Sequence, residues 1–286
     1  MPHIVHIEDD FDMEKIRTSG QCFRIARLDE GAYRAIAGDK VLYMRKAGSA
    51  SADESDGSGA NAGADWEVSC TPEEWGSFWS AYFDLGRDYS AIRAACEGRN
   101  AFVDEAMAYG RGLRILAQDP WEMLITFIVS QRKNMPAIAS AVEQLAQRFG
   151  SPVETERGTV YAFPTPEQLA AASEDDLRAC SLGYRAPYIA ETTRQVLSGE
   201  LDLRSLAEAD DAALFEGLQK ACGVGAKVAN CVCLFGYGRT SQVPVDVWIA
   251  RAIDEECGGV DPFAQFGEDA GIMQQYVFYY MTDRRK

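Results

Sequence analysis

Residues 218–238 read LQKACGVGAKVANCVCLFGYG, and this stretch decides how the second half of the chain is interpreted. Two apolar segments flank Gly223-Val224-Gly225, which predicts a helix–hairpin–helix because glycine reaches backbone angles closed to other residues. The second helix would present unpaired N–H groups at its N-terminus, which suits a phosphate. A P-loop is excluded, because it has four residues between its glycines and Ser or Thr after the lysine. The remaining alternative is a tight turn between packed helices.

Lys227 and Asp246 are the candidate catalytic residues. Lys227 lies in the first turn of the predicted second helix, with Cys231 one turn later on the same face. The only histidines are His3 and His6, so a Ser/His or Cys/His nucleophile system is not expected. Asp246 stands between valines in VPVDVW and is expected to cap the helix that follows. A surface lysine and a purely structural cap are the alternatives to catalysis.

The composition indicates an acidic globular protein without a membrane segment. The chain has 286 residues, a formal net charge of −16, 47% hydrophobic residues and 25% charged residues. It has no run of about 20 apolar residues, and its first residues lack the basic start and apolar core of a signal peptide. We therefore expect a cytoplasmic protein, associated with the nucleoid if bacterial. Eight cysteines without CxxC or zinc spacing predict no metal site, and no cofactor is expected.

The apolar pattern changes from strand-like to helical near residue 112. GQCFRIARL, GAYRAIAG and KVLYMRKA alternate apolar and polar positions, whereas capped helical segments dominate the later sequence. Residues 47–65 contain no aromatic and no basic residue, which predicts a flexible insertion before a strand at 66–70. We predict an α+β fold, with an N-terminal antiparallel sheet domain with helices over residues 1–112. An all-α helix–hairpin–helix domain would follow over residues 113–286.

Five motifs in order resemble the 8-oxoguanine DNA glycosylase family of the helix–hairpin–helix glycosylase superfamily. They are SGQCFR at 19–24, QDPWEMLITFIVSQRKNMPAI at 118–138, LGYRAPYI at 182–189, GVGAKVANC with VPVDVW at 223–248, and QQYVF at 274–278. Only the segment 47–65 has no counterpart in that family. The resemblance implies a TBP-like N-terminal domain and a glycosylase domain after it.

The resemblance implies a bifunctional DNA glycosylase and AP lyase that flips the damaged nucleotide out of the duplex. Lys227 would attack the sugar C1′ and expel 8-oxoguanine, and the resulting Schiff base would permit β-elimination of the 3′ phosphate. Asp246 would support lysine activation and stabilise the oxocarbenium-like transition state. The expected partner is duplex DNA that contains 8-oxoguanine. The protein is expected to act as a monomer and to bind no membrane.

The resemblance also implies a lesion pocket and a set of DNA contacts. The Gly20 carbonyl would accept from the N7–H that only the oxidised base carries, and an unpaired acceptor opposite guanine is worth roughly 1–3 kcal/mol. Gln274 would form hydrogen bonds with the Watson–Crick edge of the base, and Phe278 and Cys231 would lie on either side of its ring. The expected DNA contacts are Arg132, Asn134, Tyr184, Arg185, Gly223, Gly225, Val247 and Trp248.

Several positions depart from the family pattern. Arg132 replaces a common asparagine and Trp248 a common histidine, while Ala137 stands where some members carry an arginine that reads the opposite cytosine. Asn230 replaces an aspartate before the cysteine. The departures at Arg132 and Ala137 predict looser discrimination of the opposite base. None of the four departures replaces Lys227 or Asp246, so the expected reaction class is unchanged.

The acidic charge is compatible with DNA binding because it is unevenly distributed. Residues 219–251 carry a local charge of +3 and residues 131–150 carry +2. The negative charge lies elsewhere, which predicts weak non-specific binding with strong salt sensitivity.

Other function classes make different demands on these residues. A monofunctional alkylpurine or other base glycosylase would need only the aspartate, and Lys227 argues against it. A non-catalytic helix–hairpin–helix DNA-binding protein needs neither Asp246 nor a lesion pocket. A lysine-dependent enzyme acting on small carbonyl compounds would leave the glycine hairpin unexplained.

Overall fold

The computed structural model describes residues 2–48 and 63–284. Most of the predicted insertion at 47–65 lies outside the described residues, and its last two residues already belong to a strand. The chain forms two compact units that do not follow a single cut along the sequence. The first comprises Met1–Ala35, Leu42–Ala117 and Val245–Lys286, and the second comprises Ile36–Val41 and Gln118–Pro244. The predicted domain boundary at residue 112 remains a prediction.

Five strands form an antiparallel sheet in the order β1-β5-β4-β3-β2. They are β1 (His3–Ile7), β2 (Ile25–Arg27), β3 (Tyr33–Ala37), β4 (Lys40–Lys46) and β5 (Ala64–Val68). Alternation along the strands gives one buried face, which includes Leu42, Met44, Trp66 and Val68. Gly38 lies in the tight turn between β3 and β4 with φ of +59°, as the Gly-Asp pair predicts.

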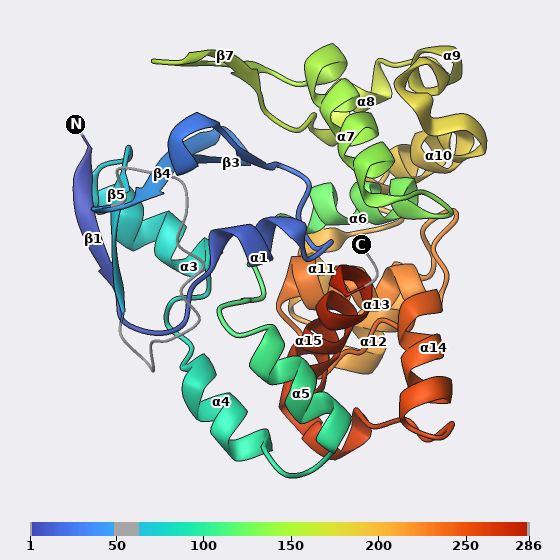
Figure 1. Cartoon of the computed structure of the whole chain (residues 1–286). Helices are drawn as coiled ribbons and strands as arrows, with labels where there is room; N and C mark the ends of the chain where they lie inside the picture. Colours follow the sequence, from blue (N-terminus) through green and yellow to red (C-terminus); the bar gives the residue numbers. More distant parts are fainter. Residues whose placement is uncertain (1, 49–62, 285–286) are drawn as a thin grey trace. The chain divides into compact units, whose positions relative to one another are not determined.

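The C-terminal helix α15 (Ala270–Asp283) forms the centre of the helical part of the first unit. It contacts α5 (Ala101–Tyr109) and α14 (Val247–Glu256), and nearly all of its residues are buried (Figure 1). The other helical segments of this unit are α1 (Met13–Thr18), η1 (Asp29–Gly31), α2 (Pro72–Glu74), η2 (Trp75–Trp79), α3 (Ser80–Tyr82), α4 (Tyr89–Cys96) and η5 (Ala264–Asp269). Most residues of α15 are apolar or aromatic, as expected of a helix that is buried on nearly all sides.

The second unit is built on a pair of helices, α6 (Pro120–Ser130) and α13 (Ala226–Tyr237), which pack along each other. Phe127 and Phe235 stack across this pair with ring centroids 5.5 Å apart. Asp119 caps α6 through the Glu122 N–H at 2.8 Å, as its position before Pro120 predicts. The remaining helical segments are α7 (Met135–Phe149), α8 (Pro166–Ala170), α9 (Glu174–Leu177), η3 (Arg178–Leu182), η4 (Gly183–Arg185), α10 (Ala186–Leu197), α11 (Leu203–Ala207) and α12 (Asp211–Leu218).

The second unit also contains a short hairpin that was not expected from the helical pattern. Strands β6 (Pro152–Thr155) and β7 (Gly158–Tyr161) pair antiparallel after α7 (Figure 1). Gly158 has φ of +104°, which glycine adopts readily. Thr159, Val160 and Tyr161, which follow that glycine, were the available sequence signal. The α+β class with an N-terminal antiparallel sheet is confirmed, and this hairpin is an addition to it.

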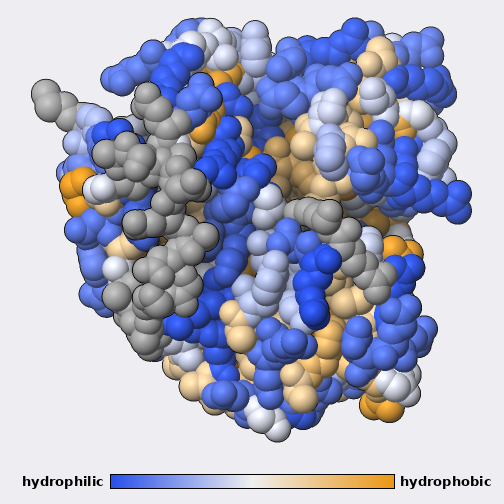
Figure 2. All heavy atoms as spheres, in the orientation of Figure 1, coloured by the Kyte–Doolittle hydropathy of each residue, from blue (hydrophilic) through white to orange (hydrophobic). Residues whose placement is uncertain are grey.

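Acidic residues occur in both units, and one cluster of them lies on a short surface helix of the second unit that carries no candidate site residue. Helix α9 begins with Glu174, Asp175 and Asp176, and two of these carboxylates pair with Arg178. Hydrophilic residues predominate over α8, α9 and α10 on the face shown in Figure 2. Among the described residues, no helix is long and apolar enough to cross a membrane.

Candidate active site and DNA-binding surface

The two glycines of the hairpin have different structural roles. Gly223 has φ of +77°, and a Cβ placed there would lie 2.5 Å from Cδ2 of Tyr188. Gly225 has φ of −96°, and a Cβ there would meet no atom within 4 Å. Gly223 is therefore needed for the fold of the hairpin. Gly225 instead leaves open space at the N-terminus of α13.

Helix α13 begins without a side-chain cap. Gly225 is its N-cap residue, and among the described residues of the second unit no side chain accepts a hydrogen bond from the first N–H groups of the helix. These amides lie at the positive end of a twelve-residue helix, an arrangement that favours an anion such as a DNA phosphate. The hairpin predicted from the glycine spacing is thus present, and in the described part of its unit the first N–H groups of α13 have no side-chain acceptor.

Lys227 extends from the first turn of α13 over an aromatic ring. Its Nζ lies 5.1 Å from the centroid of Phe127, a residue that is 3% exposed. Within the described residues of the second unit, Lys227 makes no hydrogen bond or ion pair. Cys231, one turn further along α13, is buried. The half-buried amine is thus held against apolar surface, with no acceptor in its own unit to occupy it.

Gln131 connects the hairpin to a second loop, a role that the sequence did not reveal. Its Nε2 donates to the Gly223 carbonyl at 3.0 Å and to the Ile128 carbonyl at 3.2 Å. Its own backbone carbonyl accepts from the guanidinium of Arg185. A glutamine at a helix end carries no local signal for contacts to residues 54 and 92 positions away in the chain.

Three loops of the second unit therefore lie together, at residues 131–134, 181–185 and 222–226. Lys133 Nζ donates to the Ser181 carbonyl at 2.7 Å and joins the first two loops directly. Burial and the neighbouring Arg185 guanidinium lower the pKa of Lys133. Arg132 and Ser181 both have φ near +60°, at 53° and 61°, which is unusual for residues with a side chain. The cluster supplies positive charge and backbone donors on one surface.

The predicted DNA contacts in these loops differ in exposure. Arg132 and Asn134 are exposed, and Asn134 also caps α7 by accepting from the Ala137 N–H at 2.9 Å. Tyr184 is 48% exposed, whereas Arg185 is only 6% exposed. The Arg185 guanidinium lies 4.4 Å from the centroid of the Tyr184 ring. In this structure Arg185 supports the loops and Tyr184, so its contact with DNA remains a prediction.

Asp246 caps α14 in the first unit, as its position between valines predicts. Its Oδ1 accepts from the N–H groups of Trp248 and Ile249, both at 3.0 Å. Within the described part of this unit, Oδ2 accepts no hydrogen bond. Val247 is 78% exposed, and the Arg251 guanidinium lies 5.4 Å from the Trp248 ring. One carboxylate oxygen is thus structural, and the other is available for chemistry.

The first unit also brings three of the predicted lesion-pocket residues onto adjoining segments. Gly20 has φ of +77° and lies in the loop after α1. Gln275 of α15 donates to the Ser19 carbonyl at 2.7 Å, which ties this loop to the helix that carries Gln274 and Phe278. Gln274 is buried and Phe278 half-buried, and their i, i+4 spacing places them on one face of α15.

Comparison with known proteins identifies the family. Residues 4–124 match the model of the 8-oxoguanine DNA glycosylase N-terminal domain, and residues 125–261 match that of HhH-GPD superfamily base excision DNA repair proteins. The chain is 32% identical to a probable N-glycosylase/DNA lyase of Methanothermobacter thermautotrophicus, over 68% of this chain and 71% of that protein. The chain belongs to the 8-oxoguanine DNA glycosylase/AP lyase family.

Two solved structures extend the similarity over the whole chain. An 8-oxoguanine glycosylase/lyase of Clostridium acetobutylicum, bound to duplex DNA with cytosine opposite 8-oxoguanine, has 32% identity and a TM-score of 0.86. That alignment covers 99% of each chain. MBOgg1 in complex with a low-affinity DNA ligand has 34% identity and a TM-score of 0.89, over 100% of this chain and 96% of that one.

As a member of this family, the chain is a bifunctional DNA glycosylase with AP lyase activity that acts in base excision repair. Gly20 falls within the N-terminal family model, and the hairpin with Lys227 and Asp246 within the second. Gln274 and Phe278 lie after residue 261, beyond both models. In the described part of the glycosylase, no group of three or more His, Cys, Asp or Glu residues is placed to hold a metal ion.

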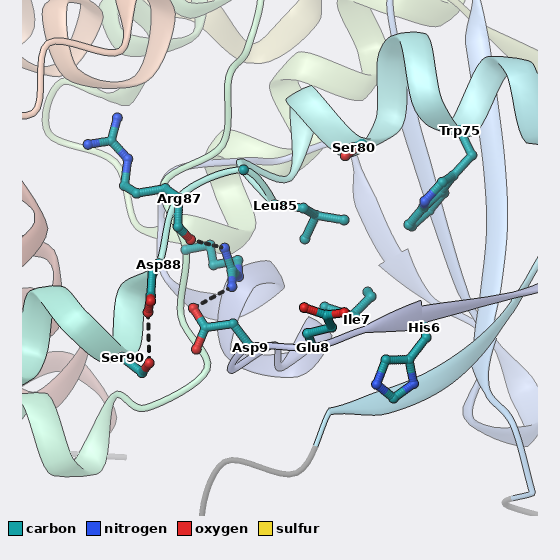
Figure 3. Close-up of a pocket in the computed structure, with 12 residues that line it drawn as sticks. His6, Ile7, Glu8, Asp9, Trp75, Ser80, Leu85, Arg87, Asp88 and Ser90 are labelled. Carbon is teal, nitrogen blue, oxygen red and sulfur yellow. Dashed lines mark hydrogen bonds and ion pairs between the residues drawn. The ribbon is translucent and has the colours of Figure 1, made fainter.

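A cavity of about 550 Å³ in the first unit of the glycosylase is formed by β1, the loop after α3 and the start of α4 (Figure 3). Arg114 donates to Asp9 at 2.9 Å and to the Arg87 carbonyl at 3.2 Å, and Ser90 donates to Asp88 at 2.7 Å. None of the predicted site residues lines this cavity. Because several of its polar groups are hydrogen-bonded to one another, we assign these bonds a structural role.

Proposed function

We propose that this chain excises 8-oxoguanine from duplex DNA through a covalent intermediate on Lys227. The supporting observation is the position of Lys227 in the first turn of α13, next to the uncapped amides of the hairpin. A phosphate held by those amides would bring a nucleotide close to the amine. The Phe127 ring at 5.1 Å keeps the amine over apolar surface instead of in bulk water.

In the proposed reaction the Lys227 amine forms a bond to C1′ as the C1′–N9 bond breaks. The departing 8-oxoguanine takes the electron pair and acquires a proton. The C1′–O4′ bond then breaks, O4′ takes up the proton that the amine nitrogen loses, and a Schiff base forms between Nζ and C1′. Removal of a proton from C2′ breaks the C3′–O bond and releases the 3′ phosphate, which cuts the strand. We assign Asp246 to lysine activation and to stabilisation of positive charge on the sugar, a role open to its Oδ2.

DNA binding is proposed to rest mainly on the loops of the second unit. The amides of Gly223 and Gly225 would hold a phosphate, and the exposed Arg132 and Asn134 would contact the strand opposite the lesion. The exposed ring of Tyr184, supported from below by Arg185, would act as the wedge that fills the vacated stack. Val247 and Trp248 at the start of α14 are proposed as further contacts with the DNA backbone.

Recognition of the lesion is assigned to four groups. The Gly20 carbonyl would accept the N7–H of 8-oxoguanine, and Gln274 would bond its Watson–Crick edge. Phe278 and Cys231 would stack on the two faces of the base. Since guanine lacks the N7–H, it would leave a buried acceptor unpaired at a cost of about 1–3 kcal/mol, roughly 5- to 150-fold in rate. We further propose that the enzyme acts as a monomer in the cytoplasm, or at the nucleoid of a bacterial cell.

Borohydride trapping tests the assignment of Lys227. Wild-type protein with an 8-oxoguanine:C duplex should give a covalent complex, and Lys227→Gln should abolish it. Lys220→Gln is the matched control, because it removes the same charge from an exposed lysine of the same hairpin region and should trap normally. Trapping that persists in Lys227→Gln would refute the assignment. Base release without any trapping by the wild type would favour a monofunctional mechanism based on aspartate alone.

A further inference from the structure

The backbone around Gly20 is held by buried side chains on both sides. Gln21 is fully buried, and its Nε2 donates to Ser19 Oγ at 3.0 Å and to the Arg114 carbonyl at 2.8 Å. Its Oε1 accepts from the Leu116 N–H at 2.8 Å. These bonds fix the chain immediately after Gly20.

Gln275 fixes the chain immediately before Gly20. This residue is 2% exposed, and its Nε2 donates to the Ser19 carbonyl at 2.7 Å. The Ser19 carbonyl belongs to the same peptide unit as the Gly20 N–H, so this bond sets the plane of the 19–20 peptide. Glycine at φ of +77° has no Cβ to restrict it, so its conformation depends on such external contacts.

The Gly20 carbonyl itself is left available by this arrangement. Among the described residues of the first unit, none donates a hydrogen bond to it. An acceptor kept free by bonds to its neighbours is suited to read a donor on a ligand. Gln275 is also adjacent to Gln274 on α15, and successive helix residues point about 100° apart. Adjacent residues of α15 thus have different tasks, because Gln274 is assigned to the base and Gln275 holds the loop that carries Gly20.

We propose that Gln275 is a positioning residue for lesion recognition, which orients the Gly20 carbonyl toward the N7–H of 8-oxoguanine. This inference rests on the proposed function of Gly20. Gln275 would act only through the loop and would touch neither the base nor the sugar. Its loss would therefore weaken selection of the oxidised base, and the chemistry of Lys227 would be retained.

The test compares two activities of the same protein, measured in single-turnover reactions. Excision of 8-oxoguanine requires base recognition, whereas strand cleavage at a preformed abasic site involves no base. Gln275→Met keeps the side-chain volume and removes the donor. It should slow 8-oxoguanine excision roughly tenfold or more, with abasic-site cleavage within about twofold of wild type.

Two further variants separate positioning from general destabilisation. Gln275→Asn keeps a buried amide but shortens its reach, and should show the same separation of activities, including where the Met variant fails to fold. Thr193→Val is the matched control, because it removes a buried hydrogen bond to a backbone carbonyl in the second unit. It should leave the ratio of the two activities unchanged.

Three results would overturn the inference or its basis. Equal loss of both activities in the Gln275 variants would mean that Gln275 has a purely structural role. Unchanged excision would show that the loop needs no such support. A wild-type protein that cleaves abasic sites but leaves 8-oxoguanine in place would remove the proposed function, and this inference with it.

Discussion

Replacing each hairpin glycine by alanine should separate folding from DNA binding. Gly223 and Gly225 are two positions apart in the same motif, yet their surroundings differ. At Gly223 a new Cβ would lie 2.5, 2.7 and 3.1 Å from three atoms of Tyr188, in a backbone with φ of +77°. At Gly225 the backbone angles are open to any residue, and a new Cβ would meet no atom within 4 Å.

The two costs follow from these geometries. Overpacking against Tyr188 costs about 1–3 kcal/mol, and a left-handed alanine costs about 1–2 kcal/mol. Gly223→Ala should therefore lower the free energy of unfolding by roughly 2–5 kcal/mol. In Gly225→Ala, the weaker helix-capping preference of alanine and the reduced entropy of the unfolded chain offset each other to within about 1 kcal/mol.

Urea unfolding followed by circular dichroism measures the stability of both variants. Fluorescence anisotropy with a duplex that carries an abasic-site analogue measures their binding. Gly225→Ala should fold like wild type but bind DNA more weakly, because its methyl group would lie where a phosphate is proposed to approach the α13 amides. If Gly223→Ala were as stable as wild type, or if both variants lost the same stability, the assignment of separate roles would be refuted.

Two further predictions concern Asp246 and Tyr276. Asp246→Asn retains an oxygen that can cap α14, so its unfolding temperature should stay near that of wild type while its rate of excision falls about 10²–10³-fold. Asp246→Ala should lose excision and, in addition, about 1 kcal/mol of stability. If Asp246→Asn excised the base as fast as wild type, a catalytic role for Asp246 would be contradicted. Burial raises the pKa of Tyr276 to about 12, whereas the pKa of a tyrosine in the unfolded chain is near 10. As the pH rises above 10, the unfolded chain therefore loses this phenolic proton before the folded protein does. Its contribution to stability should be complete below about pH 10 and decline above it, by up to about 1.4 kcal/mol per pH unit, and Tyr276→Phe should reduce that slope in urea unfolding experiments at increasing pH.

Local features of the fold were predictable because they depend on residues close in sequence. The caps of α6 and α14 each need one aspartate and the two or three residues after it, so Asp119 and Asp246 could be identified directly. The hairpin followed from Gly223 and Gly225, and the antiparallel sheet from alternating apolar residues. The β6–β7 hairpin was missed because its strands have only four residues each and lie between strong helical patterns.

The sequence by itself determined the family, the reaction class and the residues proposed to carry it, because these depend on residue types at characteristic spacings. The tertiary structure decided which side chains hold those residues in place. Gln131 meets Gly223 across 92 positions, and Gln275 meets Ser19 across 256. It also buried Arg185, whose motif had suggested an exposed DNA contact. Such contacts depend on how distant segments pack, and a glutamine or arginine looks the same in a sequence whether its partner is water, DNA or a backbone carbonyl.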